Sequence, residues 1–438
     1  MYLLPQRATR VELAMVVFVT LILSGAMSAL YVKLFRYSPP LPDMVVILPV
    51  MMAMVLHMLL RIREVIVGSL VAWAWAGLAL LALASTQWSV SPSDTFRESL
   101  ITVVAVPWLA MMAVISDWRD LLTRIWLGCV ILLFVTLALY LLSPQLGRMQ
   151  DVYAGALVGP WHEKNATGQF LCWTALLSLA VIAVKPARLV PAALVWVACV
   201  VALPFTQSAT ALLATAAGSA VFGWVALMRR HAVVSIPALL ATGLLAAPIG
   251  MLLLGSGEDI LRSLGRSGTL TGRLPIWEAL RDYAVNERPL LGHGYSAYWS
   301  DAYSFGRREF VFDQLGFEAR HSHNSFLEMR LALGWVGTGL WLAAVGQGVL
   351  MSILRIRSSQ GAYLALPFIV AATAVALVEV SLVGVGNLGG MLFVLILAKM
   401  SLRPSAADAG SGVRTTLDSV SNAAMRSRPP HSPAPRLG

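Results

Sequence analysis

Long apolar runs recur along almost the whole sequence, and they decide what the chain can fold into. Hydrophobic residues make up 58% of the 438 positions and only 12% are charged, against about 25% charged in an ordinary soluble domain. A helix needs about 20 apolar residues to cross a bilayer, and backbone groups in lipid must be hydrogen-bonded within the protein. The sequence therefore predicts an all-α polytopic membrane protein. Twelve runs are candidate spans: 12–31, 43–60, 65–85, 98–115, 123–143, 167–184, 189–204, 209–228, 232–254, 326–353, 362–383 and 385–400.

Lys and Arg alternate between the connections of these runs. Every second connection carries a basic pair, and such connections remain in the cytoplasm. The pairs are Arg7 and Arg10, Arg61 and Arg63, Arg119 and Arg124, Lys185 and Arg188, Arg229 and Arg230, Arg355 and Arg357, and Lys399 and Arg403. Outside one long loop, the opposite connections hold only Lys33, Arg36, Arg97, Arg148 and Lys164. We therefore expect about twelve spans, with both termini cytoplasmic and the long loop, about 256–330, facing outward.

The net charge, the absence of several catalytic motifs and the cysteine positions limit the classes of function that the sequence supports. The net charge of +10 comes mainly from the basic connections, since the long loop is nearly neutral, so it does not indicate a nucleic-acid partner. The sequence has no GxxxxGK[ST], HExxH, GxSxG or GxGxxG motif in a suitable context. Cys129, Cys172 and Cys199 lie in apolar runs and are expected to be buried. We expect a transmembrane helical domain over 1–403 and a disordered cytoplasmic tail over 404–438, which is rich in Ser, Ala, Pro and Arg.

Charged groups are scarce inside the candidate spans, where they usually mark function. His57 is expected to be packed and hydrogen-bonded, and Glu379 lies near the outer end of its run, where it can face water. This scarcity disfavours a proton-coupled transporter. The conspicuous polar clusters fall on the outward connections instead.

The first polar cluster is GPWHEKNATGQ, residues 159–169, which leads directly into a span. It places His162, Glu163, Lys164 and Asn165 at the boundary. A snorkelling Lys with a capping Asn explains the pattern structurally. A cation at the positive end of a helix is also a site for an anion. The residues alone leave both interpretations open.

The second cluster lies within 267–299 of the long loop. Thr271 and Pro275 are helix start signals and Pro289 is a stop signal. An apolar face at helical spacing predicts a helix that lies on the membrane surface or packs over the bundle; it comprises Ile276, Leu280, Tyr283 and Ala284. Arg273 then sits at the helix start, where it is either a solvated charge or a bidentate ligand for phosphate.

The third cluster is RHSHNSFLEMRLALGWVGTG, residues 320–339. His321 and His323 immediately precede a span that Ser322 or Asn324 can cap. The helix dipole lowers the pKa of a His at this end, so the neutral imidazole can accept a proton. A His that only caps or packs remains an alternative. Two His at i and i+2 also suggest a metal, but the sequence shows no further ligands for it.

Taken together, these motifs resemble the signature of the O-antigen ligase and polymerase superfamily. His323-Asn324, nine residues and then Gly334-Trp335-Val336-Gly337-Thr338 match its pattern of His-Asn/Ser/Gln, nine residues and Gly-x-x-Gly-Thr. Thr271-Gly272-Arg273, Trp277, Pro289-Leu290-Leu291-Gly292-His293-Gly294 and His162-x-Lys164-Asn165 resemble the same family. The combination is most similar to the exopolysaccharide-polymerising, ExoQ-like branch.

The resemblance implies a multi-helix glycosyltransferase of the GT-C type that needs no metal, cofactor or nucleotide sugar. Its donor is a glycan on undecaprenyl pyrophosphate, and its acceptor is a growing polysaccharide or another glycan. Arg273 is expected to bind the donor pyrophosphate, and His323 to be the catalytic base. Related ligases have Arg where Lys164 stands. The expected substrate-binding residues are Lys164, His162, Asn165, Trp277, His321 and Asn324.

We therefore expect a polymerase of lipid-linked repeat units in the bacterial inner membrane. Membrane lipid surrounds it, and a chain-length regulator and a flippase are candidate protein partners. Glu163 or His321 is an alternative base or an orienting partner for His323. Aromatic side chains that stack on sugars or mark the membrane interface are Trp161, Tyr295, Tyr298 and Trp299. A ligase acting on lipid A core or protein, a flippase for lipid-linked saccharides and a scaffold of an export complex remain alternatives.

Overall fold

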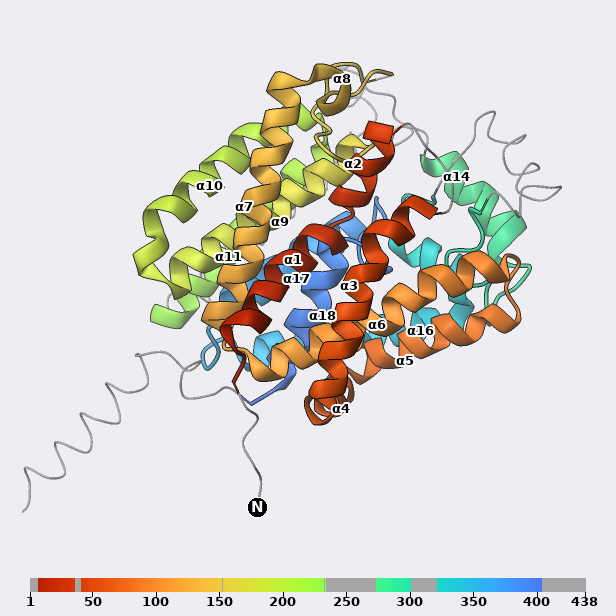
Figure 1. Cartoon of the computed structure of the whole chain (residues 1–438), viewed down its shortest axis with the longest axis horizontal. Coiled ribbons are helices and arrows are strands. Elements are labelled where there is room, and N and C mark those ends of the chain that lie inside the picture. Colours follow the sequence, from red (N-terminus) through yellow and green to blue (C-terminus); the bar gives the residue numbers. More distant parts are fainter. Residues whose placement is uncertain are drawn as a thin grey trace, which may run out of the picture.

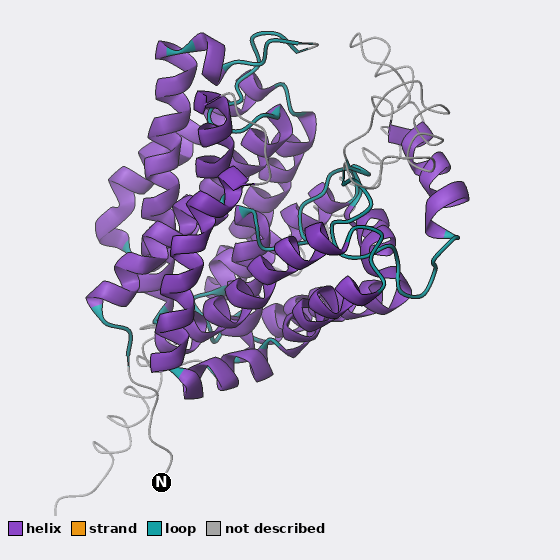
Figure 2. Ribbon diagram, turned by 45° about the vertical axis from the view of Figure 1, so that its right-hand side comes forward, coloured by secondary structure: helices purple, strands orange, loops and turns teal. Residues whose placement is uncertain are grey.

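Helices make up the protein in the computed structural model, which describes residues 7–35, 41–151, 153–231, 233, 273–300 and 321–403. None of these residues lies in a β-strand (Figure 2). The expected all-α membrane fold is confirmed. The segment 404–438, the run 232–254 and residues 271 and 272 lie outside the described residues, apart from residue 233.

The helices of the described residues are labelled in chain order in Figure 1. They are α1 (Arg10–Leu23), α2 (Ala26–Phe35), α3 (Leu41–Leu60), α4 (Ile62–Val71), α5 (Trp73–Ala84), α6 (Pro92–Ile115), α7 (Trp118–Leu142), α8 (Pro144–Gly147), α9 (Lys164–Val184), α10 (Leu189–Ala202), α11 (Ala209–Arg230), α14 (Arg273–Leu280), α16 (Ser325–Leu354), α17 (Ala362–Ala376) and α18 (Leu388–Ser401). A π-helical segment, Arg281–Val285, continues α14.

The described residues do not show the expected twelve spans. Among the described residues, six helices are long and apolar enough to cross a membrane, or eight if each of two bent pairs counts as one span. The α1–α2 pair bends by 51°, and the α3–α4 pair bends by 101°. α17 and α18 are shorter apolar helices. A hydropathy run measures apolar length and does not detect a bend or an early end, so the runs overstated the continuous helices.

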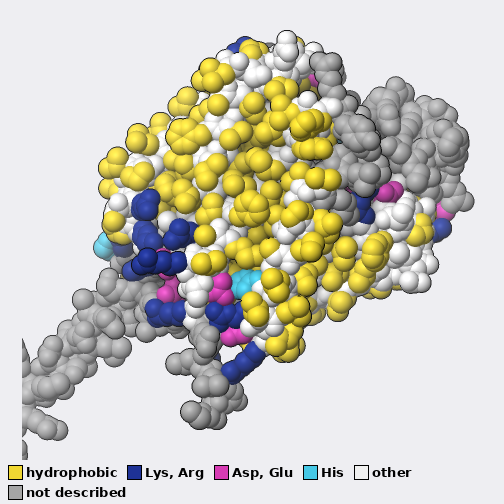
Figure 3. All heavy atoms as spheres, viewed as in Figure 1, with side chains coloured by type: hydrophobic (Ala, Val, Ile, Leu, Met, Phe, Trp, Pro, Cys, Tyr) yellow, Lys and Arg dark blue, Asp and Glu magenta, His cyan; other side chains and the backbone are white. Residues whose placement is uncertain are grey.

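The basic connections meet at one end of the bundle. The Ala8 N–H donates to the Ile115 carbonyl (2.9 Å), and Lys399 Nζ donates to the Ser116 carbonyl (2.6 Å). Further contacts at this end are Arg119 with Gln360, Lys185 with Asp120, and Arg229 with the carbonyls of Ile356 and Ser359. Figure 3 shows Lys and Arg side chains gathered at the lower edge, below a broad hydrophobic face. The alternation of charge in the sequence therefore corresponds to one end of the molecule.

His57 is packed and hydrogen-bonded, as expected from the sequence. Its Nε2 lies 2.8 Å from Glu12 Oε1, and its Nδ1 accepts from Trp108 Nε1 at 3.1 Å. Arg61 completes an ion pair with the same carboxylate. The three cysteines are free and buried, which confirms that expectation too. The contacts of His57 with Glu12 and Trp108 join α1, α3 and α6 near the basic end. The candidate catalytic residues lie at the other end.

The glycine-rich motifs join α16 to the loop after α14. α16 breaks at Gly334, whose φ is +61° and ψ −156°. Around the break, the N–H groups of His293 and Gly294 donate to the carbonyls of Leu331 and Ala332, and those of Trp335 and Val336 donate to Pro289 and Leu290. Backbone groups freed by the kink are thus satisfied by the loop. The glycines of both motifs serve this close backbone approach.

Candidate active site

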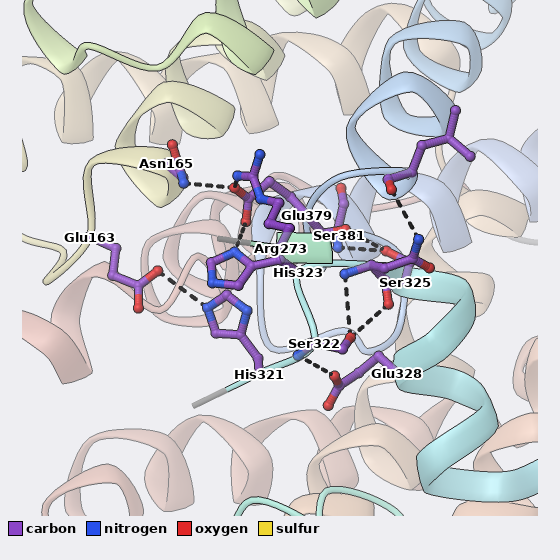
Figure 4. A network of polar contacts seen from close by, with 12 residues as sticks. Glu163, Asn165, Arg273, His321, Ser322, His323, Ser325, Glu328, Glu379 and Ser381 are labelled. Carbon is purple, nitrogen blue, oxygen red and sulfur yellow. Dashed lines mark hydrogen bonds and ion pairs between the residues drawn. The ribbon is translucent and has the colours of Figure 1, made fainter. Parts of the chain in front are cut away.

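A buried carboxylate, Glu379, is the centre of a polar network (Figure 4). It follows the C-terminal end of α17, which begins at the basic connections, so the network lies at the opposite end of the bundle. Only 3% of the Glu379 side chain is exposed. Its Oε1 accepts from Asn165 Nδ2 (2.7 Å) and from Arg273 Nη2, and its Oε2 faces His323 Nδ1 at 3.1 Å. A buried charge is tolerated only when it is paired and hydrogen-bonded, and Asn165, Arg273 and His323 are the partners of this carboxylate. The expectation that Glu379 faces water is wrong.

The Ser325 hydroxyl fixes the Glu379 loop to the start of α16. Ser325 Oγ donates to the Glu379 carbonyl (2.9 Å) and accepts from the Ser381 N–H (3.0 Å). Asn324 caps the helix by accepting from the Leu327 N–H (2.9 Å). Its Nδ2 donates to Leu377 (3.0 Å), so this expected substrate ligand also anchors the loop after α17. These contacts place His323 and Glu379, which are 56 residues apart, against each other.

His323 has a left-handed backbone, with φ +52°. This conformation is uncommon outside glycine, and residues held in it gather at functional sites because the surrounding structure must enforce it. Trp277 contributes to this constraint, since its Nε1 donates to the Ser322 carbonyl at 2.8 Å. With the Nδ1 proton donated to Glu379, the neutral ring of His323 has an Nε2 lone pair that can accept a proton.

The His321 ring lies against the His323 ring, with 3.9 Å between the ring centroids and the ring planes tilted by 52°. Its Nε2 lies 3.4 Å from Oε2 of Glu163, the N-cap residue of α9. Burial alone would lower the pKa of His321, but the hydrogen bond and charge of Glu163, with the charges of Glu328 and Glu379, raise it above its usual value. The two imidazoles therefore differ in their partners: one carboxylate is buried and the other is half exposed.

His321, His323 and Glu379 could together hold a metal ion, because one ligand atom from each lies within 4.8 Å of the others. The third ligand that the sequence did not show is Glu379. Arg273 already forms an ion pair with the same carboxylate, and its positive charge opposes a cation at this point.

Two expected substrate ligands do not join the Glu379 network in their described contacts. Lys164 Nζ donates to the Gln207 carbonyl (2.9 Å) and lies 3.6 Å from the centre of the Tyr153 ring. His162 is exposed and lines a separate polar pocket with Lys33 and Arg148. By contrast, Asn165, Arg273, His321 and His323 come together as the sequence motifs suggested, while Trp277 and Asn324 support the backbone.

The four aromatic residues proposed as sugar platforms are mostly buried. Trp161, Tyr295 and Tyr298 are 7%, 6% and 4% exposed, so little of each ring is free to stack on a sugar. Trp299 is partly exposed, and its Nε1 donates to Glu328 Oε1 at 2.8 Å. Packing within the protein therefore accounts for these four aromatic residues, and no sugar ligand is needed to explain them.

A pocket of about 290 Å³ adjoins the network. Its lining includes the polar residues Glu163, Asn165, His321 and Glu379 and the aromatic residues Trp161, Phe170 and Trp173. The N-termini of α9 and α18 both border it, through Ala166 and Leu388. The first N–H groups of a helix carry partial positive charge and favour an anion near them.

Sequence reasoning missed the residues that assemble this site. Glu379 and Ser381 belong to no part of the motifs, and Ser325 lies within the third cluster but was not singled out; Glu379 was visible as a rare acid in an apolar run. A buried acid beside the Gly-rich segment GVGNLGG, residues 384–390, was the available signal.

Comparison with known proteins agrees with the motifs. The sequence profile of the family described as O-antigen ligase matches residues 193–342, which include Arg273 and His323. The chain is 27% identical over 289 residues to the exopolysaccharide production protein ExoQ of Rhizobium meliloti (strain 1021). That match covers 62% of this chain and 63% of the relative. The resemblance inferred from the sequence is confirmed.

Proposed function

We propose that this chain, a member of the O-antigen ligase family through residues 193–342, is a membrane glycosyltransferase that polymerises lipid-linked oligosaccharide repeat units. The observation that carries the proposal is the ion pair and hydrogen-bond network of Arg273, Glu379 and His323 beside a pocket bordered by helix N-termini. The donor is a glycan on undecaprenyl pyrophosphate, and the acceptor is a hydroxyl of another glycan.

Arg273 binds the donor pyrophosphate in this proposal. Its guanidinium is 13% exposed and has one terminal nitrogen on Glu379, while its Nε is buried without a hydrogen-bond partner. A guanidinium fork can hold a diphosphate bidentately. Negative charge grows on the leaving diphosphate as the glycosidic bond breaks, and a fixed cation with nearby helix N-termini stabilises that charge. No ATP is needed, because the lipid diphosphate is already an activated leaving group.

His323 is the general base in the same scheme. Its Nε2 takes the proton of the acceptor hydroxyl while that oxygen bonds to the anomeric carbon and the carbon–oxygen bond to the diphosphate breaks. A direct displacement of this kind inverts the anomeric centre. Glu379 holds the Nδ1 proton and stabilises the imidazolium that forms, so it acts as a positioning residue for His323.

The directions of the described helices support an outward-facing site. α6, α9, α11, α16 and α18 end at the basic connections, and α7, α10 and α17 begin there. Arg229 lies at the basic end, and Arg273 lies beside Glu379 at the opposite end. Because basic connections remain in the cytoplasm, this arrangement favours cytoplasmic termini and a site on the outer face of the inner membrane.

A ligase that transfers finished glycan to lipid A core or protein is the second candidate. The family description names an O-antigen ligase, whereas the name of the R. meliloti relative refers to exopolysaccharide production. Both reactions use the same donor and base, and they differ in the acceptor. A flippase is disfavoured, because the charged network lies at the helix ends and not along the bundle.

Reconstitution tests the proposal. The purified chain is placed in liposomes with undecaprenyl-pyrophosphate-linked repeat units and without nucleotide sugar. We expect a ladder of longer lipid-linked glycans from the wild type, and none from Arg273→Ala or His323→Ala. Arg357→Ala, an exposed Arg at the basic end, is the matched control and should retain the ladder. Transfer only to an added lipid A core would favour the ligase, and wild-type ladders from both site variants would remove these residues from the mechanism.

A further inference from the structure

Arg330 is a buried arginine that has no anionic partner among the described residues. It lies in α16 and is 8% exposed, and its Nε is enclosed without a hydrogen bond. The guanidinium carbon lies 3.6 Å from the centre of the Trp335 ring, which is its closest described interaction. Arg330 follows His323 by seven residues, or roughly 10 Å along a helix, so it is separate from the Glu379 network.

A buried arginine without a carboxylate partner among the described residues is expected to bind an anion. The guanidinium stays charged at any physiological pH, and a buried charge without a counterion is costly. Stacking on Trp335 offsets part of that cost but leaves the fork of N–H donors unused. By comparison, Arg273 and Arg61, which are buried to a similar degree, each have a carboxylate partner.

The surface next to Arg330 is apolar and exposed. Trp335 is 49% exposed, and Phe326 packs edge-on against it and is 39% exposed. The hydrogen bond from the Val336 N–H to the Leu290 carbonyl brings in Leu290, which is 65% exposed. A cation set into an apolar surface near the end of a membrane helix complements a lipid, because the phosphate can meet the arginine while the acyl or prenyl chain covers the apolar side chains.

We propose that Arg330 and Trp335 form a second phosphate site, which binds the phosphate group of a membrane lipid whose chain lies over Phe326 and Leu290. The phosphate oxygens accept from the guanidinium fork, and the Trp335 ring holds the guanidinium plane in place. The site does not depend on the proposed reaction, since it requires neither Arg273 nor His323.

Lipid binding to the purified chain in detergent tests the site, by native mass spectrometry. The probes are undecaprenyl diphosphate, phosphatidylglycerol, phosphate-free diacylglycerol and inorganic pyrophosphate. We measure each in the Arg273→Gln background so that the donor site does not contribute. Binding of a lipid with phosphate should weaken by about ten- to a hundredfold in Arg330→Gln, which is the range for losing hydrogen bonds to a charged group. Arg330→Lys should be intermediate, because it keeps the charge without the fork.

The controls separate the outcomes. Arg357→Gln changes an exposed Arg at the basic end, and in the same background it should bind these lipids as tightly as the Arg273→Gln parent does. Tighter binding of undecaprenyl diphosphate than of phosphatidylglycerol would identify a polyprenyl lipid as the source of the phosphate, and the reverse would identify a phospholipid. Equal binding by Arg330→Gln and its parent would overturn the proposal. The proposal would also be overturned if the Arg273→Gln parent bound diacylglycerol or free pyrophosphate as tightly as the lipids that carry phosphate. This comparison does not need Arg330→Gln, so it still tests the site if that variant fails to fold.

Discussion

Glu379 Oε2 lies 3.1 Å from His323 Nδ1, while Glu379 Oε1 accepts from Asn165 and Arg273. One buried carboxylate thus contacts the proposed base and the proposed diphosphate ligand at the same time. Ser325 and Ser381 hold the backbone of that carboxylate in place. In the proposed mechanism, this single side chain links proton acceptance by His323 to leaving-group binding by Arg273.

Glu379→Gln should lower kcat by about a hundredfold or more, within the range for loss of a well-oriented general base. A Gln amide has nearly the same shape, but it removes the charge that fixes the Nδ1–H tautomer of His323 and stabilises its imidazolium. The measurement is glycan transfer in liposomes, with kcat and KM determined separately and across pH. Glu278→Gln changes an exposed acid on α14 and should leave kcat unchanged. A wild-type kcat and pH profile for Glu379→Gln would exclude Glu379 from positioning the base.

The sequence predicted the helical membrane class and the grouping of the basic connections at one end of the bundle. It also predicted four residues that lie together at the site, Asn165, Arg273, His321 and His323. Apolar length and alternating charge are local properties, and His321, His323 and Arg273 stand next to helix starts. The partner of His323 could not be predicted in this way, because Glu379 approaches it through the tertiary contact of Ser325 with the loop after α17. Bends such as that between α1 and α2 depend on packing and leave hydropathy unchanged.

Labelling of single cysteines should place the two ends of the bundle on opposite sides of the membrane. Asp151 and Arg357 are exposed at the site end and the basic end. A membrane-impermeant maleimide should label Asp151→Cys in intact spheroplasts, and Arg357→Cys only after the membrane is opened. The three native cysteines are buried, so the parent protein should give a low background. Labelling of residue 357 in intact spheroplasts would reverse the proposed orientation.

The His321–Glu163 pair should make stability depend on pH in one direction. The pKa of His321 is raised above its ordinary value of 6.5, so the folded state binds the proton more tightly than the unfolded state. The stabilisation is therefore fully present below pH 6.5 and is lost as pH rises through the raised pKa of His321. Thermal unfolding should show a larger loss of Tm in Glu163→Gln just below pH 6.5 than at alkaline pH.

The matched variant for this test is again Glu278→Gln, whose Tm should follow the wild type at every pH. Glu328 and Glu379 also raise the pKa of His321, so the Glu163→Gln difference should shrink with pH without changing sign. A Tm difference that grows toward alkaline pH would contradict the proposed pairing.

Gly334 should tolerate no side chain, because the motif glycine lies where the PLLGHG loop contacts the broken α16. A Cβ at this position would lie 2.3 Å from the carbonyl carbon and oxygen of Leu290, and the φ of +61° is itself unfavourable for alanine. We expect Gly334→Ala to destabilise the protein by roughly 2 kcal/mol or more, from backbone strain and overpacking. Gly339→Ala and Gly346→Ala, on the same helix with nothing within 4 Å of the added Cβ, should be neutral or stabilising by up to about 1 kcal/mol. Thermal unfolding of the three variants in detergent, with monodispersity checked by size exclusion, measures the contrast. Equal stability of Gly334→Ala and Gly339→Ala would show that the loop does not restrict this position.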